Sequence, residues 1–136
     1  MDSKLKILKF SLLAGAIYFA LVSIAHMIGY KVPILFVYFD VPSYPYQDRI
    51  ISFLAFGWAI FLFTAFLNPK NKDLIKAILI SGTVAIIGLV IINLTTDFTI
   101  LSKDININYF WMETMGLLVY ILWLIYFYIK SAKINK

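Results

Sequence analysis

Five polar residues in or beside long apolar stretches of this sequence could bind a ligand or move a proton. His26, Asn93 and Glu113 lie inside such stretches, whereas Arg49 and Asp97 lie at their edges. A histidine and a carboxylic acid can act as an acid–base pair near neutral pH. Arg49 is the sole arginine of the chain, and a planar guanidinium can hold a carboxylate through two hydrogen bonds. These residue types indicate a polar site for a ligand, a proton or an ion pair.

The apolar stretches around these residues have the length of membrane spans. Hydrophobic residues make up 62% of the 136 residues, charged residues make up 14%, and the mean hydropathy is +0.90. A soluble domain is about half apolar and a quarter charged. The four long apolar stretches are residues 10–29, 50–67, 74–96 and 109–129. They lack the alternation of barrel strands, so four transmembrane helices are predicted, because spans must satisfy their own backbone hydrogen bonds.

The distribution of basic residues predicts the orientation of these helices. Three basic residues, Lys31, Arg49 and Lys103, occur near one end of the expected bundle. The others occur near the opposite end: Lys4, Lys6, Lys9, Lys70, Lys72, Lys76, Lys130, Lys133 and Lys136. By the positive-inside rule both termini are expected to be cytoplasmic. The first span could also be read as a secretory signal, but its apolar run continues past the cleavage-like sequence, which favours an uncleaved helix.

These observations predict an all-α membrane protein, a single domain over residues 1–136. Its four helices should form an up-down bundle in a plasma membrane, with the bacterial inner membrane preferred. The net charge of +5 is then a consequence of topology, and no nucleic-acid partner is expected. The two outer connections should form a small extracytoplasmic cap. We expect the segment "ILFVYF" to be a short strand or an interface segment resting on the bundle, and the alternation of Ile105, Ile107 and Tyr109 predicts a brief strand.

The five polar residues are expected to share one end of the bundle. With a rise of about 1.5 Å per residue, His26, Asn93 and Glu113 fall in one layer about 5–6 Å below the outer boundary. Ionisable groups inside a span are costly there and are functional candidates. Helical spacing adds five candidate lining residues: Ser23, Tyr30, Phe53, Phe56 and Tyr120. Each of these residues could instead have a purely structural role. Arg49 could anchor its helix at the membrane interface, Glu113 could be a paired or solvated group, and His26 could form a hydrogen bond between helices.

Three functions fit this pattern. The first is an accessory protein that binds a small amphipathic or anionic ligand, or a partner protein, at the outer site. The second is an enzyme acting on a lipophilic substrate such as a quinone, with His26 and Glu113 as the acid–base pair. The third is an oligomeric proton- or ion-coupled transporter. With one histidine and no cysteine, neither a metal nor a cofactor is expected.

In its length, its four expected helices and its expected topology, the chain resembles small bacterial membrane proteins of the DoxX-like or BphX-like kind. The resemblance covers most of the chain but includes no sequence motif, so it transfers no residue and no activity. It implies a four-helix bundle and a quinone-linked redox setting.

Overall fold

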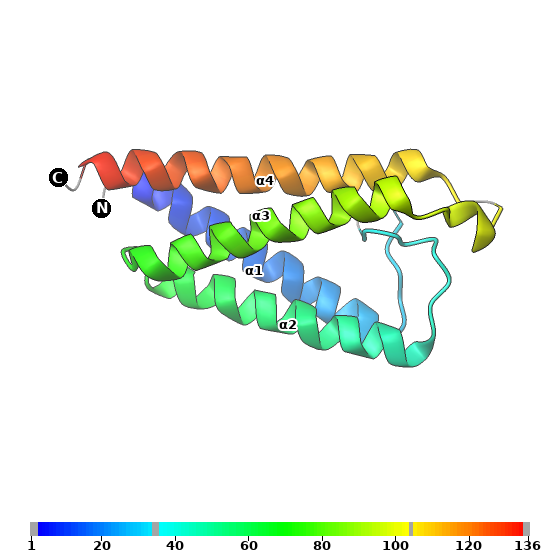
Figure 1. Cartoon of the computed structure of the whole chain (residues 1–136). Coiled ribbons are helices and arrows are strands. Elements are labelled where there is room, and N and C mark those ends of the chain that lie inside the picture. Colours follow the sequence, from blue (N-terminus) through cyan, green and yellow to red (C-terminus); the bar gives the residue numbers. More distant parts are fainter. Residues whose placement is uncertain (1–2, 34–35, 104, 135–136) are drawn as a thin grey trace.

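The computed structural model describes residues 3–33, 36–103 and 105–134, and this part of the chain is all-α (Figure 1). Its long helices are α1 (Ser3–Met27), α2 (Pro45–Leu67), α3 (Lys72–Thr95) and α4 (Ile107–Ile134), with a 3-10 helix, η1 (Phe98–Ile100), between the last two. All four long helices are long and apolar enough to cross a membrane. The predicted four-span membrane protein is therefore confirmed.

The helices extend beyond the apolar stretches that predicted them. α1 already begins at Ser3, and its first turns carry Lys4, Lys6 and Lys9. Lysine is a good helix former, and its long side chain can reach the headgroups while its backbone stays helical. α2 begins with Pro45, which is compatible with a first helical turn because the missing N–H would have no helical acceptor there. Each helix therefore begins before the apolar stretch that predicted it.

α1 and α2 form the most extensive helix contact, and α4 packs against both α3 and α1 (Figure 1). α2 and α3 meet closely only near their short connection, where the side chain of Asn71 caps α3 by accepting a hydrogen bond from the N–H of Leu74. The first residues of α1, the last residues of α4 and this connection lie at the same end, which we call the inner end (Figure 1).

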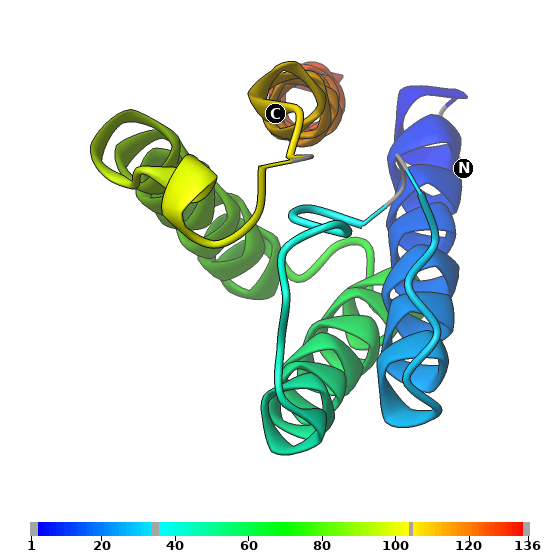
Figure 2. The ribbon, with the colours of Figure 1, turned by 90° about the vertical axis from the view of Figure 1, so that its right-hand side faces the viewer.

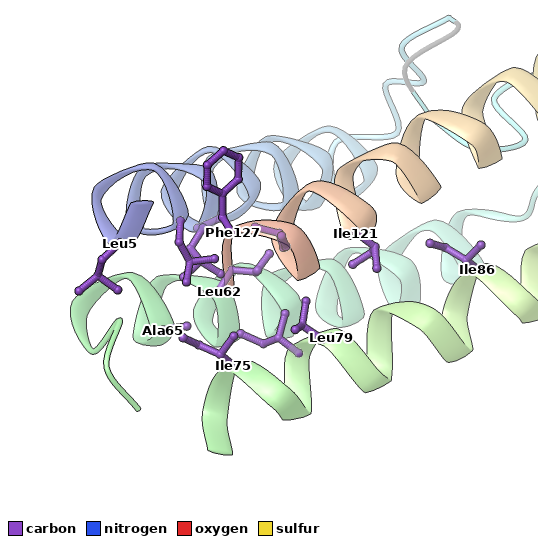
Figure 3. Close-up of a cluster of buried hydrophobic side chains, with 13 residues drawn as sticks. Leu5, Leu62, Ala65, Ile75, Leu79, Ile86, Ile121 and Phe127 are labelled. Atoms are coloured by element: carbon purple, nitrogen blue, oxygen red, sulfur yellow. The ribbon is translucent and has the colours of Figure 1, made fainter. Parts of the chain in front are cut away.

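The apolar core lies towards the inner end and draws on all four helices (Figure 3). Leu5 of α1, Leu62 of α2, Ile75 of α3 and Phe127 of α4 are all at least nine-tenths buried. Because lipid tails are as apolar as these side chains, the stabilisation comes from close packing and not from removal of apolar surface from water. This half of the bundle provides a fixed frame for the outer end.

The outer end is covered by the connection between α1 and α2 (Figure 2). Phe36 of this connection is buried against Val22 and Ala25 of α1 and Ala55 of α2. The described residues of the "ILFVYF" segment thus rest on the bundle and do not form a strand. Ile34 and Leu35 of this segment lie outside the residues that the structure describes. Contacts between Tyr38 and Phe98 join this connection to the one that follows α3.

The brief strand predicted around residues 105–109 is wrong, because α4 begins at Ile107. The side chain of Asn106 accepts a hydrogen bond from the N–H of Asn108, as a helix-capping asparagine does. This cap favours helix over the strand that the short alternation suggested.

Candidate functional site

Three of the five predicted polar residues, His26, Asn93 and Glu113, belong to two separate hydrogen-bonded groups at the outer end. The first group contains His26 at the end of α1, Asp48 in the first turn of α2, and Ser43 just before α2. His26 Nδ1 lies 3.3 Å from Asp48 Oδ1, and the two side chains are 10% and 11% exposed. The hydroxyl of Ser43 donates to both carboxylate oxygens of Asp48, at 3.0 Å each. The imidazole of His26 and the carboxyl group of Asp48 are thus within hydrogen-bond distance.

This first group is arranged for attachment of the loop and not for nucleophilic catalysis. In a serine-based relay the histidine must accept the proton of the serine hydroxyl. Here the hydroxyl of Ser43 is directed to Asp48. The imidazole of His26 also stacks on Phe36, with ring centroids 5.0 Å apart. These contacts hold the connection between the outer ends of α1 and α2.

The second group joins the same connection to α3 and α4 through Tyr38. The hydroxyl of Tyr38 donates to Asn93 Oδ1 of α3 at 2.8 Å, and its backbone N–H donates to Glu113 Oε2 of α4 at 3.3 Å. Asn93 in turn donates from Nδ2 to the hydroxyl of Thr114 at 3.1 Å. Asn93, Glu113 and Thr114 are each more than nine-tenths buried. The side chains of Asn93 and Thr114 are hydrogen-bonded to each other, and Tyr38 donates to both Asn93 and Glu113.

Tyr38 has an unusual backbone conformation, with φ of 62°. A side chain other than glycine in this left-handed region costs roughly 1 kcal/mol, so surrounding contacts must hold it there. Its ring contacts Phe98 of η1 and Phe110 of α4, with centroids 5.3 Å and 4.8 Å away. Burial, and to a lesser degree the nearby carboxylate of Glu113, raises the pKa of Tyr38 to about 12. The hydroxyl therefore remains a neutral donor at physiological pH.

A cavity of about 370 Å³ lies between α1 and α4, with Glu113 in its wall. α1 contributes Gly15, Tyr18 and Phe19, and α4 contributes Glu113, Gly116 and Tyr120. Tyr120 lies seven positions after Glu113 on α4, so the cavity extends about 10 Å along the helix at 1.5 Å per residue. Its wall is mainly apolar and aromatic, and the carboxyl group marks its outer part.

The inner end of this cavity is closed by Tyr120. Its hydroxyl donates to the backbone carbonyl of Ser11 at 2.9 Å. A Cβ atom at Gly15 would collide with this hydroxyl, so the missing side chain permits the close approach of α4. Trp123 adds a second bond from Nε1 to Ser11 Oγ at 2.9 Å. Small residues on α1 thus allow aromatic side chains of α4 to hydrogen-bond directly to α1.

Glu113 has one oxygen that the described residues leave without a partner. Oε2 accepts the N–H of Tyr38, whereas Oε1 is buried and has no hydrogen-bond partner. Oδ1 of Asp40, in the same connection as Tyr38, is likewise buried and unpartnered. The two carboxyl groups are close enough to interact electrostatically. Of these two carboxyl groups, that of Glu113 lines the mainly apolar cavity.

Several predicted site residues lie elsewhere. Arg49 is exposed and forms no ion pair within the described part of the chain, so it is not the partner of Glu113 or Asp97. Asp97 is exposed and accepts from the N–H and hydroxyl of Thr99, which caps η1. Three of the predicted lining residues have exposed side chains and do not line the cavity: Tyr30, Phe53 and Phe56. Ser23 is buried, with its hydroxyl 3.3 Å from that of Ser52.

The structure therefore places Glu113 and Tyr120 in the cavity wall, whereas Asn93 lies outside the wall and is bonded to Tyr38 and Thr114. Sequence reasoning did not select Tyr38, Asp40 or Asp48 as site residues. Asp48 could have been selected from the sequence, because it is a carboxylate at the start of a span. Its pairing with His26 becomes apparent only in the folded structure. No group of three or more metal-ligating side chains occurs among the described residues.

In comparisons with family models, curated proteins and solved structures, the chain matches none of them.

Proposed function

We propose that this four-span membrane protein binds a small amphipathic molecule in the cavity between α1 and α4. The observation that carries the proposal is the buried carboxyl group of Glu113 in the wall of an otherwise mainly apolar cavity. The volume of about 370 Å³ is in the range of small-molecule sites. Such sites combine an apolar wall with a few polar groups that orient the ligand.

The positions of the other polar residues favour this role over the alternatives. An anionic ligand would require a cation in the wall, and Arg49 lies outside it. An acid–base pair would require contact between His26 and Glu113. Instead, His26 is bonded to Asp48, and Glu113 is bonded to the backbone of Tyr38. A binding or accessory role needs neither arrangement.

The same proposal places the cavity towards the extracytoplasmic side of a plasma membrane, with both termini in the cytoplasm. Support comes from the lysine-rich inner end, since Lys70 and Lys72 flank the connection between α2 and α3. Lys4, Lys6 and Lys9 lie in the first turns of α1 at that end. Orientation follows such basic clusters near helix ends.

Filling the cavity tests the proposal. A Cβ atom at Gly116 would meet no atom within 4 Å, so Gly116→Phe can place a ring in this space without displacing the backbone. Gly88 of α3 is equally open and lies outside this cavity wall, so Gly88→Phe is the matched control. The probe is a long-chain alcohol carrying a photoreactive diazirine, with labelled residues identified by mass spectrometry.

We expect the alcohol to label cavity residues in the wild type and in Gly88→Phe. Labelling there should fall by about tenfold in Gly116→Phe, because loss of a well-filled apolar site costs well over 1.4 kcal/mol of binding free energy. Labelling of the exposed residue Phe53 provides the internal reference. Equal cavity labelling in all three proteins would contradict a binding site in this space.

A further inference from the structure

The unpartnered oxygens of Glu113 and Asp40 restrict the chemistry of the ligand. Glu113 is 8% exposed, and its Oε1 has no donor among the described residues. Oδ1 of Asp40 is also buried and has no hydrogen-bond donor among the described residues. Leaving a buried acceptor unsatisfied is unfavourable, and more so when the group is charged. Because Glu113 lines the cavity, a donor carried by a ligand can reach its unpartnered oxygen.

The described part of the protein supplies no cation for this carboxyl pair. Lys31, the nearest lysine along the connection, donates from Nζ to the carbonyl of Val41 at 2.8 Å and lines a different cavity. Neither Glu113 nor Asp40 takes part in an ion pair within the described residues. Arg49 is exposed on α2. A positive charge for this site must therefore come from outside the described chain.

The rest of the wall suits an organic cation. Aromatic rings of Tyr18, Phe19 and Tyr120 line the cavity. Ring faces attract cations, and the attraction is stronger where water is excluded. The apolar length beyond the carboxyl group can hold the hydrocarbon part of the same molecule.

Resting on the proposed function, we propose that the ligand is a primary ammonium compound with a hydrocarbon chain, whose ammonium group donates to Oε1 of Glu113. The Asp40 carboxylate adds electrostatic attraction. A free long-chain amine and the ethanolamine headgroup of a phospholipid share this chemistry. The three N–H donors of an ammonium group can satisfy acceptors from more than one side.

The test compares two photoreactive probes with identical diazirine-bearing chains, one a primary amine and the other an alcohol. The protein is reconstituted in phosphatidylcholine nanodiscs, and cavity labelling is divided by labelling of Phe53 to correct for partition into lipid. In the wild type we expect the amine to label the cavity about tenfold more than the alcohol, since hydrogen bonds to charged groups are worth about 1.5–3 kcal/mol.

Charge-removing variants then test the assignment to the carboxyl groups. Glu113→Gln keeps the shape of the side chain, and it should reduce the preference for the amine to about twofold or less. Asp40→Asn should reduce it by about two- to threefold, because this carboxylate acts at longer range. Asp97→Asn, which alters an exposed carboxylate at η1, is the matched control and should keep the full preference. Asp40→Asn serves as the second variant if Glu113→Gln is poorly folded.

Competition distinguishes the two sources of the ammonium group. Unlabelled dodecylamine competing better than phosphatidylethanolamine would support a free amine, and the reverse would support a lipid headgroup. Competition by dodecanol as strong as that of either compound would overturn the proposal. If the alcohol labels the cavity as well as the amine does, the ammonium assignment fails and the binding site remains. If neither probe labels the cavity above Phe53, the proposed function itself fails.

Discussion

Replacing Tyr38 with phenylalanine tests the reasoning about how the outer end is held together. The change removes the hydroxyl that donates to Asn93 Oδ1 at 2.8 Å but keeps the ring contacts with Phe98 and Phe110. Direct hydrogen bonds between membrane helices contribute roughly 0.6 kcal/mol on average. Here the acceptor residue is 8% exposed, so an unsatisfied oxygen adds a cost of about 1 kcal/mol or more. We expect a total loss of about 1–2 kcal/mol in unfolding free energy.

Equilibrium unfolding in mixed detergent micelles measures this loss, and Tyr46→Phe is the matched control. Tyr46 is 60% exposed, and its ring stacks on Tyr44, a contact that phenylalanine keeps. A double-mutant cycle with Asn93→Ala should show that Tyr38→Phe costs about 1 kcal/mol less when its acceptor is absent. Equal stability of Tyr38→Phe and Tyr46→Phe, or additive costs in the cycle, would refute a role for this bond in fixing the loop.

Three further predictions use the same unfolding assay. The stability advantage of the wild type over Tyr38→Phe should shrink as pH rises from about 10 to 12: the pKa of Tyr38 is raised from 10.0 to about 12 in the folded protein, so the unfolded form ionises first. A constant advantage across this range would contradict the assignment. Gly15→Val should cost about 1–3 kcal/mol because a side chain there collides with α4, whereas Gly116→Val, in open space, should cost less than about 0.5 kcal/mol. The reverse order would contradict the close approach at Gly15. Asp48→Ala should cost about 2–3 kcal/mol because it removes the acceptor of a serine and a histidine, whereas the adjacent exposed change Arg49→Ala should stay within about 0.5 kcal/mol. Equal effects of these two neighbouring changes would contradict the pairing.

The helices were predictable because long apolar runs have few alternative structures in lipid. Their ends were less predictable, since lysines and asparagines that flank the runs continue or cap the helices, as Lys4 and Asn106 do. The strand expected near Ile107 failed for the same reason: two or three alternating residues are a weaker determinant than a cap followed by a long apolar helix.

The sequence predicts the position of each polar residue along its helix, but it does not predict the direction of the side chain around the helix. A fixed rise of about 1.5 Å per residue sets depth, so His26, Asn93 and Glu113 could be assigned to one outer layer. Direction depends on a contrast between apolar and polar faces, and helices that are apolar on all sides provide little contrast.

The partners of these residues come from the connection that covers the outer end and from the first turn of α2. Asp48 and Tyr38 meet their partners across 22 and 55 residues of sequence, respectively. The φ of 62° at Tyr38 is imposed by packing against α3 and α4. It could not be predicted from the local sequence, because residues other than glycine rarely adopt this conformation. Loop and helices together satisfy His26 and Asn93 but leave Oε1 of Glu113 unpartnered beside an apolar cavity. This difference separates residues that hold the fold from the residue that we propose binds the ligand.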